Sequence, residues 1–246
     1  TVFFIILVLG LMAIRRAFKK EQSFNKFQEN FLLSVTHELK TPISSVKLFL
    51  QTLKKRSLSP EQVEQIYGQS LDEMNRLDNL VNNILMTHSI ENNNYFLDKQ
   101  PLDIAEFIQN KLSILQNSIL KGYHINMNIE PITLSVDKNA FESILVNLLE
   151  NAAKYSPVGT TIRILCKADE NYVYIDIIDE GCGIDTQKRH AVFSKFYREE
   201  NEMTRKSKGT GLGLFITKFL VKGHNGTITL KDNKPQGTVV NLKFKR

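Results

Sequence analysis

Cysteine is scarce in this sequence. Only Cys166 and Cys182 occur among 246 residues, and there is no CxxC pair or Cys/His cluster. This excludes a disulfide framework, which needs several cysteines, and gives no support to a zinc site. A reducing cytosol fits this cysteine usage best.

Charge is absent from the first fourteen residues, TVFFIILVLGLMAI. At ~1.5 Å per residue they would cover about 21 Å of a hydrocarbon core of ~30 Å, so they cannot cross a membrane alone. The basic run RRAFKK follows them, whereas a signal peptide has its basic residues first, and this order places the remainder in the cytoplasm. We therefore expect residues 1–14 to be the end of a transmembrane helix that continues upstream. A buried core helix is the alternative.

The net charge of +6 does not by itself indicate a nucleic-acid partner. Part of the excess lies in the run just described, at residues 15–20, where the edge of a membrane explains it. No nucleic-acid recognition motif is present. We expect no direct nucleic-acid partner.

Two stretches have the apolar periodicity of long helices. Large apolar residues recur every three or four positions over residues 24–53, and a second, mainly apolar stripe runs over 63–85. Between them Ser59 can cap a helix, Pro60 suits its first position, and Gln62 completes a capping box. One hairpin with a narrow apolar seam cannot enclose a core, so we expect two copies to pair into a four-helix bundle, and hence a homodimer.

The rest of the chain predicts a second, α/β domain. Residues 91–101 are polar and contain helix-disfavouring LDKQP, which indicates a linker, and helical and strand-like patterns alternate from residue 102 to 246. We expect an α+β protein: a juxtamembrane helix (15–23) continuous with a hairpin domain (24–90), then an α/β sandwich with a mixed sheet. The expected helices of the sandwich are 103–121, 138–155 and 212–222, and the expected strands are 123–129, 132–136, 160–168, 172–179, 226–231 and 237–245.

One histidine of the first helix points away from the apolar seam. His37 lies midway between Val35 and Leu39, so at ~100° per residue it faces solvent. Glu38 is adjacent and Thr41 lies one turn further on the same face. A carboxylate beside an imidazole can accept or orient the proton that a nucleophilic histidine must lose. This segment alone leaves an ordinary surface histidine open as the alternative.

A run on the helix at 138–155 has the residue types of a nucleotide site. Asn147 and Asn151, four apart, project from one face and could bind a hard cation through their amide oxygens. Lys154 suits a phosphate and Tyr155 a stacked ring. A solvent-exposed pair of asparagines is the alternative.

Glycine-rich turns follow. Asp179 ends a strand, and nearby Gly181 and Gly183 permit a flat ligand to approach the backbone. A later turn opens a helix, whose amides can face phosphate oxygens. No P-loop is present, and a Rossmann fold fits poorly. The charged stretch 198–208 suits a lid over a nucleotide. The glycines of the second turn are Gly209, Gly211 and Gly213.

Taken together, these segments resemble the bacterial two-component sensor histidine kinases from about residue 24 to 246. SVTHELKTPISSVK is similar to the family's phosphoacceptor box and NLLENAAKYS to its asparagine box. DEGCGID and GTGLGLFI resemble its two glycine boxes, and FSKFYR resembles its phenylalanine box. The five motifs occur in the family's order and spacing.

The resemblance implies a role for each matching residue. His37 is the phosphorylated residue, Glu38 assists it as acid/base, and Thr41 positions water for removing phosphate from the partner. Mg²⁺ is held by Asn151 with Asn147, and the adenine amino group donates to Asp179. The remaining roles in ATP binding are phosphate contacts by Lys154 and Arg198, stacking by Tyr155, wrapping of the triphosphate by Gly209, Thr210, Gly211, Leu212, Gly213 and Leu214, and lid packing by Phe193 and Phe196.

It also implies the partners and place of the protein. We expect ATP and Mg²⁺ as cofactors, the receiver domain of a response regulator as partner, and a bacterial inner membrane with the catalytic part in the cytoplasm. Two alternatives remain: a degenerate nucleotide-binding scaffold, and another ATPase of the same superfamily.

Overall fold

The structure is a computed structural model that describes residues 2–55, 58–92, 94–198 and 210–246. Its contacts divide the chain into two units. A helical unit contains the chain up to Val81, together with Phe196–Arg198 and Thr210–Gly211. An α/β unit contains Asn82–Lys195 and Leu212–Arg246.

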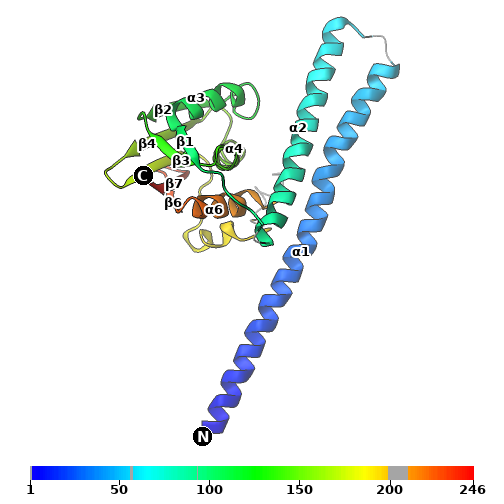
Figure 1. The fold of residues 1–246 in the computed structure, drawn as a ribbon. Coiled ribbons are helices and arrows are strands. Elements are labelled where there is room, and N and C mark those ends of the chain that lie inside the picture. The colour runs from blue at the N-terminus through cyan, green and yellow to red at the C-terminus, as the bar shows by residue number, and fades with distance from the viewer. Residues whose placement is uncertain (1, 56–57, 93, 199–209) are drawn as a thin grey trace. The chain divides into compact units, whose positions relative to one another are not determined.

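Two long helices, α1 (Val2–Lys55) and α2 (Pro60–Glu91), form the predicted hairpin (Figure 1). The juxtamembrane residues are continuous with the first hairpin helix, as expected, and the helix also runs without interruption through the buried Pro42. Across the described residues, no helix has an apolar stretch long enough to cross a membrane.

The start of α2 has the predicted capping box. The Ser59 N–H donates to Gln62 Oε1 at 3.1 Å, and the Gln62 N–H donates back to Ser59 Oγ at 3.3 Å. A cap of this kind stabilises a helix by about 0.5–2 kcal/mol, which here fixes where the second helix begins.

The apolar residues of α2 lie on two faces rather than on the single predicted stripe. One face, with Val63, Ile66 and Leu77, is half-buried in the hairpin. The other is exposed, from 41% at Val81 to 64% at Leu71. The residues of the predicted stripe were spaced by one, three or four positions. They therefore covered a wider part of the helix surface than one neighbouring helix can bury. The exposed face consists of Tyr67, Leu71, Met74, Val81 and Leu85.

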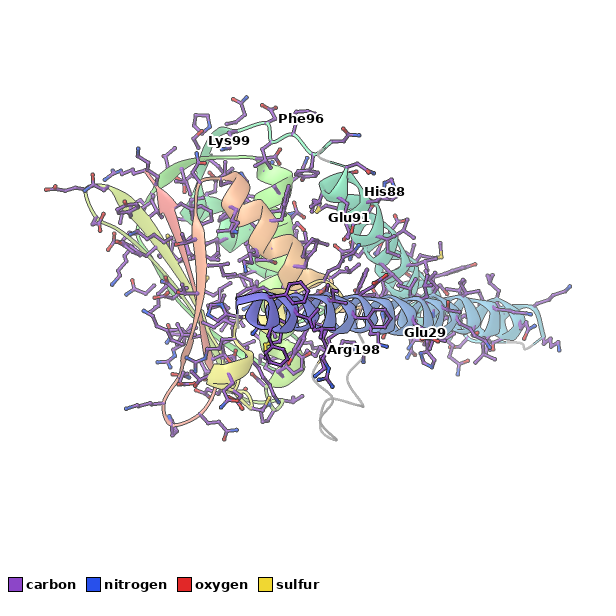
Figure 2. The ribbon with its side chains drawn as sticks, turned by 90° about the horizontal axis from the view of Figure 1, so that it is seen from below. Glu29, His88, Glu91, Phe96, Lys99 and Arg198 are labelled. Carbon is purple, nitrogen blue, oxygen red and sulfur yellow. The ribbon has the colours of Figure 1, made fainter. Side chains whose placement is uncertain are left out.

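The α/β unit is a mixed sheet with helices on one face (Figures 1 and 2). The five strands run in the order β2-β4-β5-β7-β6; β2 and β4 are parallel and the other neighbours antiparallel. Two further strands, β1 and β3, form a separate antiparallel pair. This confirms the predicted α/β sandwich. The strands are β1 (Gln100–Asp103), β2 (His124–Ile129), β3 (Thr133–Val136), β4 (Thr161–Ala168), β5 (Tyr172–Ile178), β6 (Thr227–Asp232) and β7 (Thr238–Lys245), and the helices are α3 (Ile104–Leu115), α4 (Lys138–Tyr155) and α6 (Gly213–Gly223).

Alternate residues of the central strands form the core against these helices. The ring of Phe141 in α4 lies 5.6 Å from that of Phe107 and 6.3 Å from that of Phe244. Burial raises the pKa of the Cys166 thiol to about 12, so this cysteine packs as a neutral side chain. The buried strand residues are Ile162, Ile164, Cys166, Val173, Ile175, Ile177, Val240, Leu242 and Phe244.

Two predicted boundaries differ from the structure by more than one residue. The helix expected over 103–121 ends at Leu115, and turns lead to Gly122, whose φ of +88° is left-handed. Strand β1 was not predicted, and it takes Gln100 and Pro101 from the expected linker into the sandwich. Its pairing partner is more than thirty residues away, Gln100 opposite Val136, so no local pattern marks it.

The expected linker is attached to the α/β unit well before β1. The Tyr95 ring meets Phe219 of α6 edge-on at 6.0 Å, and a Cβ added to Gly223 would lie 2.7 Å from Leu97 Cδ1. The Asp98 N–H donates to Asp137 Oδ2 at 2.9 Å. Phe96 and Lys99 are exposed (Figure 2).

A buried histidine joins the ends of α4 and α6. His224 Nε2 accepts from the Asp137 N–H at 2.9 Å, and Nδ1 donates to the Leu220 carbonyl at 2.8 Å. Each nitrogen has one role, so the bonded ring is the neutral tautomer with its proton on Nδ1. Burial lowers the pKa of His224, the Leu220 hydrogen bond raises it, Lys99 lowers it and Asp137 raises it; the net shift is downward.

Acidification is therefore expected to destabilise the α/β unit through His224. Between the lowered folded pKa and the unfolded value near 6.5, the unfolded state binds more protons, so the free energy of unfolding falls as the pH drops. Urea unfolding at pH 7.5 and about pH 5 should show a smaller loss in His224→Gln than in the parent. The exposed His190→Gln should keep the parent's loss, and equal losses in all three proteins would contradict this role.

Candidate functional site

His37 lies on the exposed surface of α1, as predicted. Beside it, Glu38 is only 9% exposed and its Oε2 accepts from Arg76 Nη2 of α2 at 2.8 Å. Thr41 Oγ1 donates to the His37 carbonyl at 3.1 Å. The histidine, a compensated carboxylate and a hydroxyl thus lie within about one helical turn. Arg76 was not predicted, because a charge on the second helix carries no pairing signal in the sequence.

The α4 residues differ in their surroundings. Asn147 is 8% exposed; its Nδ2 donates to Ser143 Oγ at 3.4 Å, and its Oδ1 lies 3.0 Å from where a Cβ on Gly213 would be. Asn151, one turn on, is half-buried. Glycine at position 213 thus lets the first turn of α6 approach α4 closely.

Lys154 and Tyr155 end α4 on its exposed side. Lys154 Nζ lies 5.0 Å from the Tyr155 ring centroid, a cation–π distance. The Tyr155 carbonyl accepts from the Cys182 N–H at 3.3 Å, which joins the end of α4 to the first glycine turn. A Cβ on Gly181 would lie 2.6 Å from that same carbonyl, so only glycine fits there.

Asp179 is held at several points and is 7% exposed. Its Oδ1 accepts from the Gly181 N–H at 2.8 Å and the Thr238 N–H at 3.0 Å. Its own N–H donates to the Thr238 carbonyl at 2.9 Å, and its carbonyl accepts from Asn233 Nδ2 at 2.8 Å. Burial raises the pKa of Asp179, and the two N–H donors partly oppose that shift.

The second carboxylate oxygen is the one available to a ligand. In the part of the chain that the structure describes, both hydrogen bonds to the Asp179 side chain end on Oδ1. A rigid, buried acceptor beside an open backbone turn suits an amino group on a flat ring. Thr238, Asn233 and Gly237 of this site were not predicted; the only signal was the Gly-Thr pair at the start of the last strand.

The second glycine box begins α6. Leu212 is buried at its N-cap, Gly213 is its first residue, and Leu214 is half-buried. Thr210 and Gly211 precede it; Gly211 has φ +71°, and a Cβ there would lie 2.7 Å from the Tyr197 carbonyl. Gly209 and residues 199–208 of the expected lid lie outside the described residues. The helix N-terminus can accept an anion.

The residues expected to pack under the lid are both buried. Lys218 Nζ lies 5.1 Å from the ring centroid of Phe193. Phe196 has a positive φ of +66°, and its N–H donates to the Gly211 carbonyl at 3.1 Å. Arg198 is exposed and does not belong to the α/β unit. Gly183, with φ +75°, completes the first glycine turn.

Three motifs that are distant in sequence therefore meet within the α/β unit. The Asp179 turn is bonded to the end of α4 through Tyr155, and α4 touches the start of α6 through Asn147 and Gly213. Among the described residues, no group of three or more histidine, cysteine, aspartate or glutamate side chains could hold a metal.

These features define a class: a nucleotide-binding α/β unit joined to a helical hairpin that exposes a histidine. Two family models match the same parts, the His Kinase A (phospho-acceptor) domain over residues 27–93 and the histidine kinase-, DNA gyrase B- and HSP90-like ATPase over residues 136–246. The chain belongs to the sensor histidine kinases of bacterial two-component systems.

Similar proteins include sensor protein SrrB of Staphylococcus aureus strain N315, 29% identical over 238 residues, which are 96% of this chain and 41% of SrrB. The chain thus spans about two-fifths of that relative. The mycobacterial sensor histidine kinase MprB is 28% identical with a TM-score of 0.54, covering 60% of this chain and 97% of its own. Full-length ShkA in complex with AMPPNP, 22% identical, shares the fold with a TM-score of 0.62 over 88% of this chain and 45% of its own.

Proposed function

We propose that this chain transfers the γ-phosphoryl group of ATP to His37 and then to an aspartate in the receiver domain of a response regulator. The observation that supports this best is the exposed histidine, beside a buried carboxylate, in the same chain as an ATPase-type site built around Asp179. Thr41 would also position water for removing phosphate from the regulator.

The nucleotide is proposed to bind through its base first. Asp179 Oδ2 accepts from the amino group of adenine, and the adenine ring stacks near Tyr155, which is 39% exposed. The second glycine box, Gly209–Leu214, wraps the triphosphate, and Lys154 and Arg198 contact its oxygens. The ShkA neighbour, which holds an ATP analogue, has the same fold.

Magnesium is proposed to bind at α4. The half-buried Asn151 presents an amide group one turn from Asn147, which is only 8% exposed and packs against Gly213. Asn151 is therefore the main ligand in this proposal, with Asn147 supporting it. Mg²⁺ held by these amide oxygens would supply positive charge against the transferring phosphate.

Transfer to His37 requires that one proton of its imidazole ring be removed or oriented by a neighbouring group. A neutral imidazole nitrogen attacks the γ-phosphorus, an N–P bond forms, and the P–O bond to ADP breaks. Glu38 accepts or orients the proton of the other ring nitrogen, and Arg76 compensates the carboxylate charge beside it.

Pairing of two chains is proposed to bury the exposed face of α2. Tyr67, Leu71, Met74, Val81 and Leu85 recur at helical spacing and are at least 41% exposed. A second hairpin would cover them in a four-helix bundle. Sedimentation equilibrium should therefore give a dimer, and Leu71→Asp with Met74→Asp should shift it to monomer.

Membrane attachment is proposed from residues 1–14 and the basic run after them. The uncharged stretch would be the cytoplasmic end of a transmembrane helix, and Arg15–Lys20 would lie at the inner surface of the bacterial membrane. Cell fractionation tests this: recovery of the protein in the soluble fraction would refute it.

Labelling with γ-³²P-ATP and Mg²⁺ tests the kinase proposal. We expect an acid-labile, alkali-stable label on the chain, which moves to a receiver domain when one is added. ATP binding without label would favour a degenerate scaffold, and phosphate release without label would favour another ATPase of the superfamily.

A further inference from the structure

The turn between β6 and β7 lies directly against Asp179. Asn233 Nδ2 donates to the Asp179 carbonyl at 2.8 Å, and the Asn233 N–H donates to the Gly237 carbonyl at 3.1 Å, closing the turn. A Cβ on Gly237, where φ is +124°, would lie 2.0 Å from the Asp179 carbonyl oxygen. Glycine at that position is what allows the contact.

Asn233 is itself held from the sheet. Its Oδ1 accepts from Arg163 Nη2 of β4 at 3.2 Å, and both side chains are half-buried. This pairing fixes the orientation of the amide, because the reversed amide would place two donors together at Arg163 and two oxygens together at Asp179. Arg163, Asn233 and Asp179 thus form one directed chain of hydrogen bonds.

The hydrogen bonds from Arg163 through Asn233 fix the backbone of Asp179, while the Gly181 and Thr238 N–H groups fix its Oδ1. Oδ2 is then held in one place, and hydrogen-bond recognition of a base requires a placement within about 0.5 Å. We propose that Asn233 is a positioning residue for base recognition: by holding the Asp179 carbonyl it lets Oδ2 distinguish a purine with a 6-amino donor from one with a 6-carbonyl. This inference rests on the proposed binding of ATP at Asp179.

Asn233→Asp is the sharpest test, since it preserves the shape and the oxygen that faces Arg163 but replaces the donor to Asp179 with an oxygen. Affinities for ATP and for ITP, which carries a carbonyl in place of the 6-amino group, are measured by calorimetry on the full chain. We expect the variant to lose about tenfold in ATP affinity, the size of one hydrogen bond, and less than about twofold in ITP affinity.

Two further variants separate positioning from folding. Gln236→Ala, in the same turn, removes an exposed side chain but keeps the Gln236 carbonyl, which accepts from Asn233 Nδ2 at 3.4 Å. Both affinities should stay at parental values. In an Asp179→Asn background, Asn233→Asp should cost no further ATP affinity, because the acceptor that it positions is gone.

The outcomes distinguish this inference from the function on which it rests. If the parent binds ATP more tightly than ITP, but Asn233→Asp lowers both affinities by the same factor or lowers neither, the role of Asn233 is refuted and base recognition by Asp179 stands. A parent without preference refutes base recognition by Asp179 and this inference with it.

Discussion

Replacement of His37 with alanine is expected to abolish the acid-labile label while ATP still binds within about twofold of the parental affinity. The imidazole is the proposed nucleophile, and His37 is exposed on α1, so its removal leaves no buried partner unsatisfied. Phosphohistidine assays detect the first effect, and calorimetry with an ATP analogue measures the second.

His88→Ala is the matched control for this variant. His88 is also an exposed histidine on a hairpin helix, in α2, and within the described residues its ring is hydrogen-bonded to Asn92. We expect it to label as the parent does. Label that persists in His37→Ala but disappears in His88→Ala would move the phosphoacceptor to α2.

A dependence on Glu38 would link the structure to this chemistry. The Glu38 carboxylate is paired with Arg76. Glu38→Gln keeps the size of this side chain but removes the group that accepts the proton. We therefore expect Glu38→Gln to slow labelling and to leave ATP affinity unchanged. Glu38 belongs to the helical unit, whereas Asp179 belongs to the α/β unit.

Local patterns predicted the elements well where a short segment determines its own structure. Ser59 and Gln62 form the predicted capping box, and α4 occupies residues 138–155 as expected, with Asp137 accepting from the Ala140 N–H at its start. Periodicity and capping act within a few residues, so the sequence shows them directly.

Contacts between distant segments could not be predicted from these local patterns. Arg76 pairs with a carboxylate 38 residues earlier, and Thr238 donates to one 59 residues earlier. Asn233 contacts Asp179 from 54 residues away. Each depends on how elements pack, and neither periodicity nor residue type encodes such a partner.

Asp179→Asn is expected to cost about tenfold to hundredfold in ATP affinity, the range for a hydrogen bond to a charged group. The new amide can still accept from the Gly181 and Thr238 N–H groups through its oxygen. Its nitrogen then takes the place of Oδ2 and faces the amino group of adenine, donor against donor. The same nitrogen can donate to a 6-carbonyl, so we expect the variant to prefer ITP to ATP.

The same substitution is expected to stabilise the fold at neutral pH. Burial raises the pKa of Asp179 above its ordinary value near 3.8, so just above that value the folded state binds more protons than the unfolded state. Stability contributed by this group therefore falls as the pH rises through that window, and asparagine carries no such penalty. Urea unfolding should show Asp179→Asn more stable than the parent at pH 7, with the difference shrinking toward pH 4. A variant that is less stable at pH 7 would show that the ionised carboxylate stabilises the fold, and that the Gly181 and Thr238 hydrogen bonds outweigh desolvation.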